Sequence, residues 1–152
     1  MKVFENLDAL LPWVGKEIAV SDWVLIDQAR INAFADATGD HQWIHVDAER
    51  AAQGPFGTTI AHGFLTLSLL PLFLQEAMHI EQVGMSINYG LNKVRFTAPV
   101  PVGSRLRTRL SLVSCDPIDN NGKQIVMQAL FEREGSDKPV CVAETLTLRY
   151  PA

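Results

Sequence analysis

The residues from 62 to about 78 constrain the fold most strongly, because they form a predicted helix that is apolar on nearly every side. A helix that is apolar around its whole circumference is normally buried around its whole circumference. Pro71 should bend this helix, because proline removes one backbone hydrogen bond and crowds the carbonyl four residues earlier. A chain with such a helix needs other elements that enclose it. Its apolar residues are Phe64, Leu65, Leu67, Leu69, Leu70, Leu72, Phe73 and Leu74.

The same region has no Asp, Glu, Lys or Arg from Ala51 to Gln75, which raises the question of a membrane span. Glycine, proline and histidine interrupt it, and its apolar part, 64–74, is too short. A transmembrane helix needs about 20 residues, whereas 10–14 indicate a buried core helix. The N-terminus mixes acidic with apolar residues and lacks the apolar region of a signal peptide. We expect a soluble, cytoplasmic protein with no membrane partner.

Strands are predicted throughout the second half of the chain. Asn121-Gly122 is a hairpin signal between two of them, and the run from Pro99 to Gly103 marks another turn. The three longest candidates alternate apolar and polar residues with period two. The predicted strands are 86–89, 93–96, 104–113, 124–132 and 140–150.

One fully apolar helix followed by antiparallel strands favours a particular packing. The sheet would curl around the helix and bury it, which gives a single α+β domain over residues 1–152. The helix has more apolar surface than one thin sheet covers, so a partner subunit is expected to cover the rest. A symmetric homodimer is the commonest such assembly.

The chain before this helix is expected to contain shorter elements. Leucine spacing predicts a helix over 7–14 that Gly15 ends, and a loose alternation rich in Val, Ile and Trp predicts a strand over 18–26. Asp27 is suited to cap the next helix. Gly39 is suited to end it, since glycine adopts the left-handed conformation at low cost.

A polar, turn-rich segment separates that helix from the apolar one. Residues 40–46 are predicted as a loop, Asp47 as the cap of a brief helix through Ala52, and 53–59 as an irregular connection. Three of the four histidines lie between this loop and the start of the apolar helix. Candidate chemical groups and the core helix are therefore neighbours in sequence.

The composition excludes several classes of protein. The formal net charge of −4 gives no basic surface for a nucleic acid. The two cysteines, Cys115 and Cys141, have no disulfide or metal spacing and are expected to be reduced thiols. The sequence contains no phosphate loop, dinucleotide fingerprint, zinc spacing or serine elbow.

Asp40 and His45 are the first candidates for chemistry, five residues apart on the predicted loop. A loop can curl so that a carboxylate and an imidazole converge on one water molecule. Such a pair can deprotonate the water and return a proton elsewhere, because histidine titrates near neutral pH. The alternative is an ordinary surface hydrogen bond, and spacing alone does not decide between them.

Gly63 is the second candidate, at the expected start of the apolar helix. Its N–H is one of the donors that a helix leaves without an intrahelical partner, and a glycine lets a ligand approach closely. The positive end of the helix dipole also favours negative charge there. Together these features make an oxyanion hole for a carbonyl that gains charge. The alternative is that Gly63 only permits tight helix packing.

Three further residues are candidate substrate contacts, and each has a structural alternative. His62 stands next to Gly63 but can serve as a hydrogen-bonded structural residue. Ser68 lies five residues beyond Gly63, and its hydroxyl can be satisfied by the backbone. Trp43 can wall a pocket or anchor the loop between Asp40 and His45.

The other charged and imidazole groups are expected at the surface. Arg105, Arg107 and Arg109 share one strand face, which is either simply solvated or could meet the phosphates of a nucleotide-bearing substrate. His41 and His79 are predicted surface residues outside the chemistry.

Two separated motifs resemble a known family. FADATGDHQWIHVD over residues 34–47 and GPFGTTIAHGFLTLS over 54–68 resemble the signature of the MaoC-like dehydratases, also called R-specific enoyl-CoA hydratases. The run INYGLNKVRFTAPVPVGSRLR over 87–107 is similar to the branch named after nodulation protein N. The resemblance extends over roughly residues 10 to 150 and is most specific from Phe34 to Ser68.

The resemblance implies a hotdog fold, in which a curved antiparallel sheet wraps one long helix and two subunits form a dimer. It implies that Asp40 and His45 are the catalytic pair and that the Gly63 N–H binds the thioester oxygen. The implied reaction is reversible addition of water to a trans-2-enoyl-CoA, which gives the (R)-3-hydroxyacyl product. The implied partner is acyl-CoA or an acyl carrier protein. No metal or redox cofactor is implied, since CoA is part of the substrate.

The sequence departs from the commoner family pattern at two places. The family has Asn-Pro after Gly-Asp and a methionine after His-Gly, whereas this chain has His41, Gln42 and Trp43 at the first place and Phe64 at the second. These larger residues leave acyl-chain length and substrate identity open. A hotdog thioesterase and a non-catalytic acyl-thioester-binding protein are the alternative functions.

Overall fold

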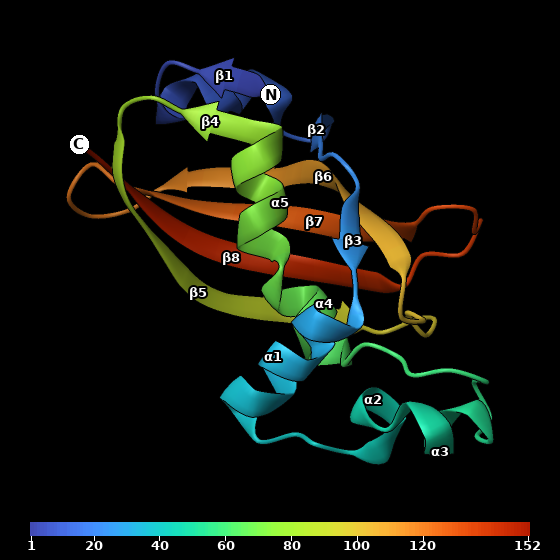
Figure 1. Ribbon diagram of the computed structural model, residues 1–152. Helices are drawn as coiled ribbons and strands as arrows, with labels where there is room; N and C mark the ends of the chain where they lie inside the picture. The colour runs from blue at the N-terminus through green and yellow to red at the C-terminus, as the bar shows by residue number, and fades with distance from the viewer.

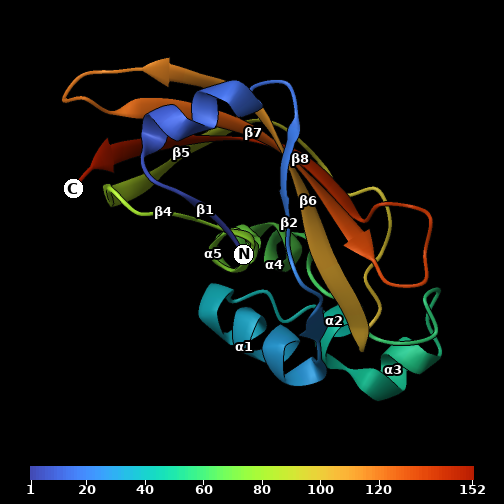
Figure 2. The same ribbon diagram turned by 90° about the horizontal axis from the view of Figure 1, so that it is seen from above.

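A curved antiparallel sheet wraps around a central helical segment in the computed structural model, which describes residues 1–152 (Figure 1). The strand order is β2-β6-β7-β8-β5, with β3 beside β6. Figure 2 shows the strands arching over α4 and α5, while α1, α2 and α3 lie on the other side of those helices. The strands of this sheet are β2 (Glu17–Val20), β3 (Val24–Ile26), β5 (Val83–Arg95), β6 (Ser104–Pro117), β7 (Lys123–Arg133) and β8 (Cys141–Pro151).

The long strands form where the sequence alternates. In β6 the inward residues Leu106, Leu110 and Leu112 are at most 1% exposed, which confirms the predicted strand and its buried face. The turn between β6 and β7 is also confirmed, but its position is shifted by one residue. Asn120 and Asn121 have the positive φ angles, 59° and 58°, rather than Asn121 and Gly122. Asparagine tolerates this conformation better than most residues.

The central helix is two helices, α4 (Gly63–Ser68) and α5 (Leu70–Ala77). The break falls at Leu69, and Pro71 stands in the first turn of α5, where its missing N–H costs least. The predicted bend is confirmed, whereas the prediction of one continuous helix over 62–78 is wrong. The predicted burial on all sides is also wrong for the single chain, because Phe64 is 70% exposed.

The elements observed in the first half of the chain largely match those predicted from the sequence. A 3₁₀ helix, η1 (Leu7–Trp13), occupies the first predicted helix, and the predicted strand 18–26 is divided into β2 and β3. The division falls at residues 21–23, where Ser21 N still donates to the carbonyl of Thr108 but Thr108 N donates to the Ser21 side-chain oxygen.

Capping residues delimit the next helices as predicted. The Asp27 side chain accepts from Arg30 N at the start of α1 (Gln28–Thr38), and Gly39 ends this helix with φ of 80°. Asp47 caps α3 (Ala48–Ala52). The prediction of a loop over 40–46 is wrong at its end, because residues Trp43–Val46 form the short helix α2.

β5 is a single strand of 13 residues, not the two short strands predicted. Gly90 and Asn92 interrupt its alternation, and the register to β8 shifts on either side of Gly90 and Leu91. β5 pairs only with β8, so its outer edge is free. A second, parallel pair, β1 (Lys2–Phe4) with β4 (Met78–Ile80), was not predicted.

The concave face of the sheet and the two central helices enclose a core of 27 buried apolar residues. Both cysteines are buried and unpaired, as expected for reduced thiols. Burial raises the pKa of Cys115, and it raises that of Cys141 to about 11. None of the helices is long and apolar enough to span a membrane.

Candidate active site

Three helix ends converge below the central helix and carry the predicted site residues. Asp40 follows the end of α1, His45 lies in α2, and His62 immediately precedes α4 (Figure 1). The carboxylate of Asp40 and the ring nitrogens of the two histidines offer atoms that all lie within 4.8 Å of one another. Residues up to 22 positions apart in sequence therefore form one cluster.

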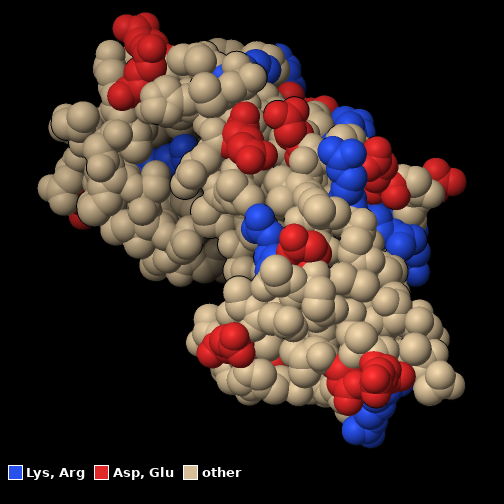
Figure 3. All heavy atoms as spheres, in the orientation of Figure 1, with Lys and Arg blue, Asp and Glu red and all other residues tan.

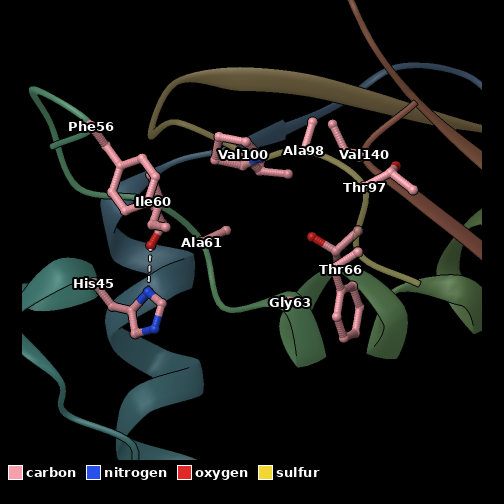
Figure 4. Close-up of a pocket in the computed structure, with 12 residues that line it drawn as sticks. His45, Phe56, Ile60, Ala61, Gly63, Thr66, Thr97, Ala98, Val100 and Val140 are labelled. Carbon is pink, nitrogen blue, oxygen red and sulfur yellow. Dashed lines mark hydrogen bonds between the residues drawn. The ribbon is translucent and has the colours of Figure 1, made fainter. Parts of the chain in front are cut away.

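His45 is buried and held in one orientation. Its Nδ1 lies 2.7 Å from the carbonyl oxygen of Ile60, which is drawn as a dashed line in Figure 4. A carbonyl only accepts, so Nδ1 carries the hydrogen and the neutral ring keeps its lone pair on Nε2. The carbonyl of His45 accepts from Gln28 Nε2 at 2.8 Å, and Gln28 accepts in turn from Thr59.

His62 is also buried, and it connects the other two groups. Its Nε2 donates to the backbone carbonyl of Asp40 over 2.9 Å, while its Nδ1 is buried without a hydrogen-bond partner. Its ring stacks on the ring of His45, with centroids 3.8 Å apart, and packs against Phe34. His62 thus supports both the backbone at Asp40 and the imidazole of His45.

Asp40 is exposed and makes a single weak contact, from Gln42 N to Oδ1 at 3.3 Å. Its carboxylate keeps most of its accepting capacity. A carboxylate and two imidazoles are also groups that bind metal ions. The expectation that the site works without a metal therefore stays a prediction.

Gly63 is the first residue of α4, and its N–H has no acceptor within the helix. It lines a hollow of about 390 Å³ together with His45 (Figure 4). The ring of Phe96 lies so close that a Cβ on residue 63 would stand 2.9 Å from it. The close approach of this ring requires a glycine here, which is a packing role in addition to any role of the N–H.

The structure places two other sequence candidates outside this hollow. The Trp43 ring packs on Gly54 and under the Arg50 guanidinium, 4.4 Å away, which matches the anchoring alternative. The Ser68 hydroxyl donates to the carbonyl of Leu65 and lines a different hollow. Their predicted contact with substrate stays a prediction.

The arginine face of β6 is neutralised by carboxylates. Arg107 and Arg109 both donate to Glu132 on β7, at 2.7 and 2.8 Å, and Arg109 also contacts Glu17. Burial acts to raise the pKa of Glu132, but the hydrogen bonds from the two arginines outweigh it and lower that pKa. No observation here favours phosphate binding by this face.

Part of the hollow was not predicted. Its far wall is the segment 96–100 between β5 and β6, with Phe96 and Thr97, and its rim includes Phe56. The sequence predicted a strand that ends at Phe96 and a turn over Pro99–Gly103, but neither prediction indicated that this segment lines a hollow beside Gly63. Gln28 and Thr59, which hold the backbone of His45, carried no signal either, because their contact joins residues 31 positions apart.

A family model described as a MaoC-like domain matches residues 11–134. The chain belongs to the MaoC-like dehydratase family. It is 55% identical over 152 residues to 3-hydroxyacyl-thioester dehydratase Z of Mycobacterium tuberculosis, with 100% of both chains covered. It is 44% identical over 137 residues to nodulation protein N of Rhizobium leguminosarum bv. viciae, covering 89% of this chain and 85% of that protein.

Among solved structures, R-hydratase PhaJ1 of Pseudomonas aeruginosa superimposes with a TM-score of 0.70 over 90% of this chain and 82% of that one, at 23% identity. This likeness confirms the predicted hotdog fold and its α+β class. The family match confirms the resemblance seen in the two sequence motifs. The chain is therefore a member of a hydratase/dehydratase family with the expected fold.

Proposed function

We propose that the protein is a hydro-lyase that adds water reversibly to trans-2-enoyl-CoA and forms (R)-3-hydroxyacyl-CoA. The observation that carries the proposal is the orientation of His45, whose Nδ1 is held by the Ile60 carbonyl. A ring nitrogen of His45 lies within 4.8 Å of an Asp40 carboxylate oxygen, and His45 lines the same hollow as Gly63. A base, a water-binding acceptor and a free N–H donor are the groups this reaction needs.

His45 acts first as the base. Asp40 holds the water molecule through its carboxylate, and His45 Nε2 takes one proton as the water oxygen bonds to Cβ of the substrate. The imidazolium that forms is stabilised by the nearby Asp40 carboxylate. His45 then returns the proton to Cα, so that one water molecule supplies both the hydroxyl and the hydrogen.

Gly63 receives the charge that develops between these two steps. Electrons of the C=C bond move onto the thioester oxygen, where the Gly63 N–H donates to the resulting enolate. Because α4 has only six residues, this single N–H contributes more than the helix dipole. Loss of one such donor typically costs about 10²–10³ in rate.

A thioester substrate is supported by the name of the M. tuberculosis relative, a 3-hydroxyacyl-thioester dehydratase. The hollow beside Gly63 has apolar walls from Phe56, Ile60 and Val140, which suit an acyl chain. We propose that CoA enters only as part of the substrate and that no metal or redox cofactor takes part. Activity should then survive dialysis against EDTA.

A homodimer is part of this proposal. The outer edge of β5 has no strand beside it, and its exposed apolar residues include Met85, Ile87 and Leu91. Such an edge is a template for pairing with another chain. A second copy related by twofold symmetry would extend the sheet and shield these residues.

The test is hydration of crotonyl-CoA by the purified protein, followed as loss of the conjugated enoyl-thioester absorbance, with chiral analysis of the product. We expect turnover to the (R)-alcohol without added metal. Release of free CoA, detected by a thiol reagent, would instead identify a thioesterase. Tight binding without turnover would identify a non-catalytic binding protein.

A further inference from the structure

The hydroxyl of Thr66 is a polar group of the catalytic hollow that takes no part in the reaction described above. Of the residues that line the hollow, only His45, Thr66 and Thr97 have polar side chains. His45 is the proposed base, and the Thr97 hydroxyl donates to the carbonyl of Pro139. Figure 4 shows the Thr66 hydroxyl pointing into the hollow instead. A hydrogen-bonding group therefore faces this largely apolar space.

Thr66 is buried, yet its hydroxyl has no partner within the chain. The residue is 2% exposed. A helical threonine often donates to the carbonyl four residues earlier, as Thr38 does to Phe34 at 2.7 Å, whereas Thr66 Oγ1 makes no hydrogen bond of this or any other kind. The carbonyl in question, that of His62, already accepts from Leu65 N and Thr66 N. The usual partner of this hydroxyl is thus occupied.

A buried hydroxyl without a partner is uncommon, because most buried polar groups in native proteins are hydrogen-bonded. Thr108 on β6 shows one form of the exception. Its Oγ1 is enclosed by the protein and has no partner, so no ligand can reach it. The Thr66 hydroxyl differs because it opens onto the catalytic hollow, where a bound molecule can accept its hydrogen. This position indicates a role in binding.

Thr66 lies one turn beyond Gly63 on α4, and both residues line the hollow. Residues three positions apart are neighbours on the same face of a helix. Helical side chains lean toward the N-terminus, so the hydroxyl of residue 66 extends over the first turn, where the Gly63 N–H is free. An O–H and an N–H can therefore converge on one acceptor.

General attraction by surface charge does not account for the placing of the reacting end of a substrate. The chain has a formal net charge of −4. Figure 3 shows basic side chains interspersed with acidic ones on one face of the molecule. Since no charged residue lines the hollow, the thioester has to be positioned by neutral donors inside it.

We propose that the Thr66 hydroxyl is a second donor of the oxyanion hole and donates to the thioester oxygen beside the Gly63 N–H. A carbonyl oxygen has two lone pairs, so it can accept both hydrogen bonds. Both bonds strengthen as negative charge develops on this oxygen during the addition of water. This role of Thr66 rests on the proposed hydratase function, and it depends on the hydroxyl rather than on the dipole of the short helix.

The surroundings of Thr66 favour this role. Ala61, Ala98 and Val100 face the same space and carry no side-chain group that could compete for the hydroxyl (Figure 4). Donors that are already oriented in an apolar site stabilise a developing charge more than water does. Ser68 is not an equivalent donor, because its hydroxyl is bonded to a backbone carbonyl and lines a different hollow.

The first test compares hydration of crotonyl-CoA by variants of the full-length protein. Thr66→Val keeps nearly the same shape without the hydroxyl, and we expect kcat to fall about 10²–10³-fold, the usual cost of one oxyanion donor, with a much smaller change in KM. Thr66→Ser keeps the hydroxyl and should keep most of the activity. Thr108→Val, the matched control, removes an enclosed hydroxyl and should leave kcat unchanged.

The second test isolates the thioester oxygen and does not require turnover. Butyryl-CoA has this oxygen, whereas the thioether S-butyl-CoA lacks it. In calorimetric titrations, Thr66→Val should weaken binding of butyryl-CoA about 2- to 10-fold, the share of one neutral hydrogen bond, and should leave binding of S-butyl-CoA unchanged. If Thr66→Val fails to fold, Thr66→Ala takes its place in both tests.

Full activity of Thr66→Val beside an active natural protein would overturn this role of Thr66 and leave the proposed hydratase function intact. Equal losses in Thr66→Val and Thr66→Ser, equal weakening of both CoA ligands, or no binding of butyryl-CoA by the natural protein would also overturn it. A natural protein that binds butyryl-CoA but does not hydrate crotonyl-CoA would remove the hydratase function instead. The comparison of the two ligands would then decide the role of Thr66.

Discussion

The protonation pattern of two stacked imidazoles defines the candidate site at the scale of single residues. His45 and His62 each donate one ring N–H to a backbone carbonyl, of Ile60 and Asp40 respectively. Each of these hydrogen bonds places a hydrogen on the nitrogen that makes it, so that any lone pair of the ring lies on the other nitrogen. The tautomer of His45 is fixed by the fold, so the proposed base does not have to reorient when substrate binds.

Replacement of the proposed catalytic pair should remove activity without unfolding the protein. We expect Asp40→Asn and His45→Gln each to lower kcat for crotonyl-CoA hydration by about 10²–10⁴, the usual contribution of a positioned acid or base. His41→Ala is the matched control. This imidazole is exposed on the same segment and contacts only Asp36, at 3.0 Å.

Circular dichroism would establish that the variants are folded, because His45 is a buried residue. Full activity in Asp40→Asn or in His45→Gln would contradict the proposed mechanism. Loss of activity in His41→Ala would show instead that the whole segment, rather than the pair, carries the effect.

The sequence indicated Asp40, His45 and Gly63 through local motifs, and the structure brings them together. It could not indicate that His62 donates to the Asp40 carbonyl, since this contact spans 22 residues and involves a backbone atom. Nor could it show that Phe96 packs against Gly63. Motifs identify reactive groups, whereas long-range contacts determine their orientation.

At the scale of elements, the end of α1 sets the position of Asp40. Gly39 has φ of 80°, a left-handed conformation that turns the chain out of the helix, and Asp40 is the next residue. A Cβ added at Gly39 would meet no atom within 4 Å. The conformation, rather than the available space, therefore accounts for the glycine.

Gly39→Ala should lower the free energy of unfolding by about 1 kcal/mol, the cost of a left-handed conformation for a residue with a Cβ. Gly39→Asn should lower it less, because asparagine adopts this conformation more readily. Urea denaturation of both variants measures the difference. Equal stability of Gly39→Ala and the natural protein would contradict this account of the turn.

Elements with a regular sequence pattern were predicted well, and irregular ones were not. β6 alternates up to the register shift after Leu112, and the predicted face of β7, with Ile125, Met127, Ala129 and Phe131, is buried, although Val126 between them is buried as well. The sequence predicts two strands where β5 lies, because Gly90 and Asn92 break the alternation. In the structure, pairing with β8 keeps β5 continuous. The short α2 has no periodicity to detect, since four residues make barely one turn.

At the scale of the whole molecule, the uncovered surfaces are concentrated on β5 and on Phe64 of α4. β5 is exposed along nearly its whole length, and Phe64 is 70% exposed. One chain thus encloses most of the central helix but leaves apolar side chains in contact with water. In the proposed homodimer, a second copy beside β5 would shield the first of these surfaces.

The protein should behave in solution as a species of twice the 16.8 kDa chain mass, measured by light scattering after size exclusion. Ile87→Lys places a charge on the free strand edge and should shift the mass toward one chain. Val113→Lys is the control, because this exposed residue lies on β6, away from that edge. A natural protein with the mass of one chain would exclude the proposed homodimer.

Both thiols lie inside the core, and this has a practical consequence for distinguishing the candidate reactions. The burial that raises the pKa of Cys115, and that of Cys141 to about 11, keeps the reactive thiolate scarce at the pH of a typical assay. A chromogenic thiol reagent added to the folded enzyme will therefore give almost no background signal. Colour that develops with an acyl-CoA present would report cleavage of the thioester, and a colourless reaction that still consumes crotonyl-CoA would report hydration.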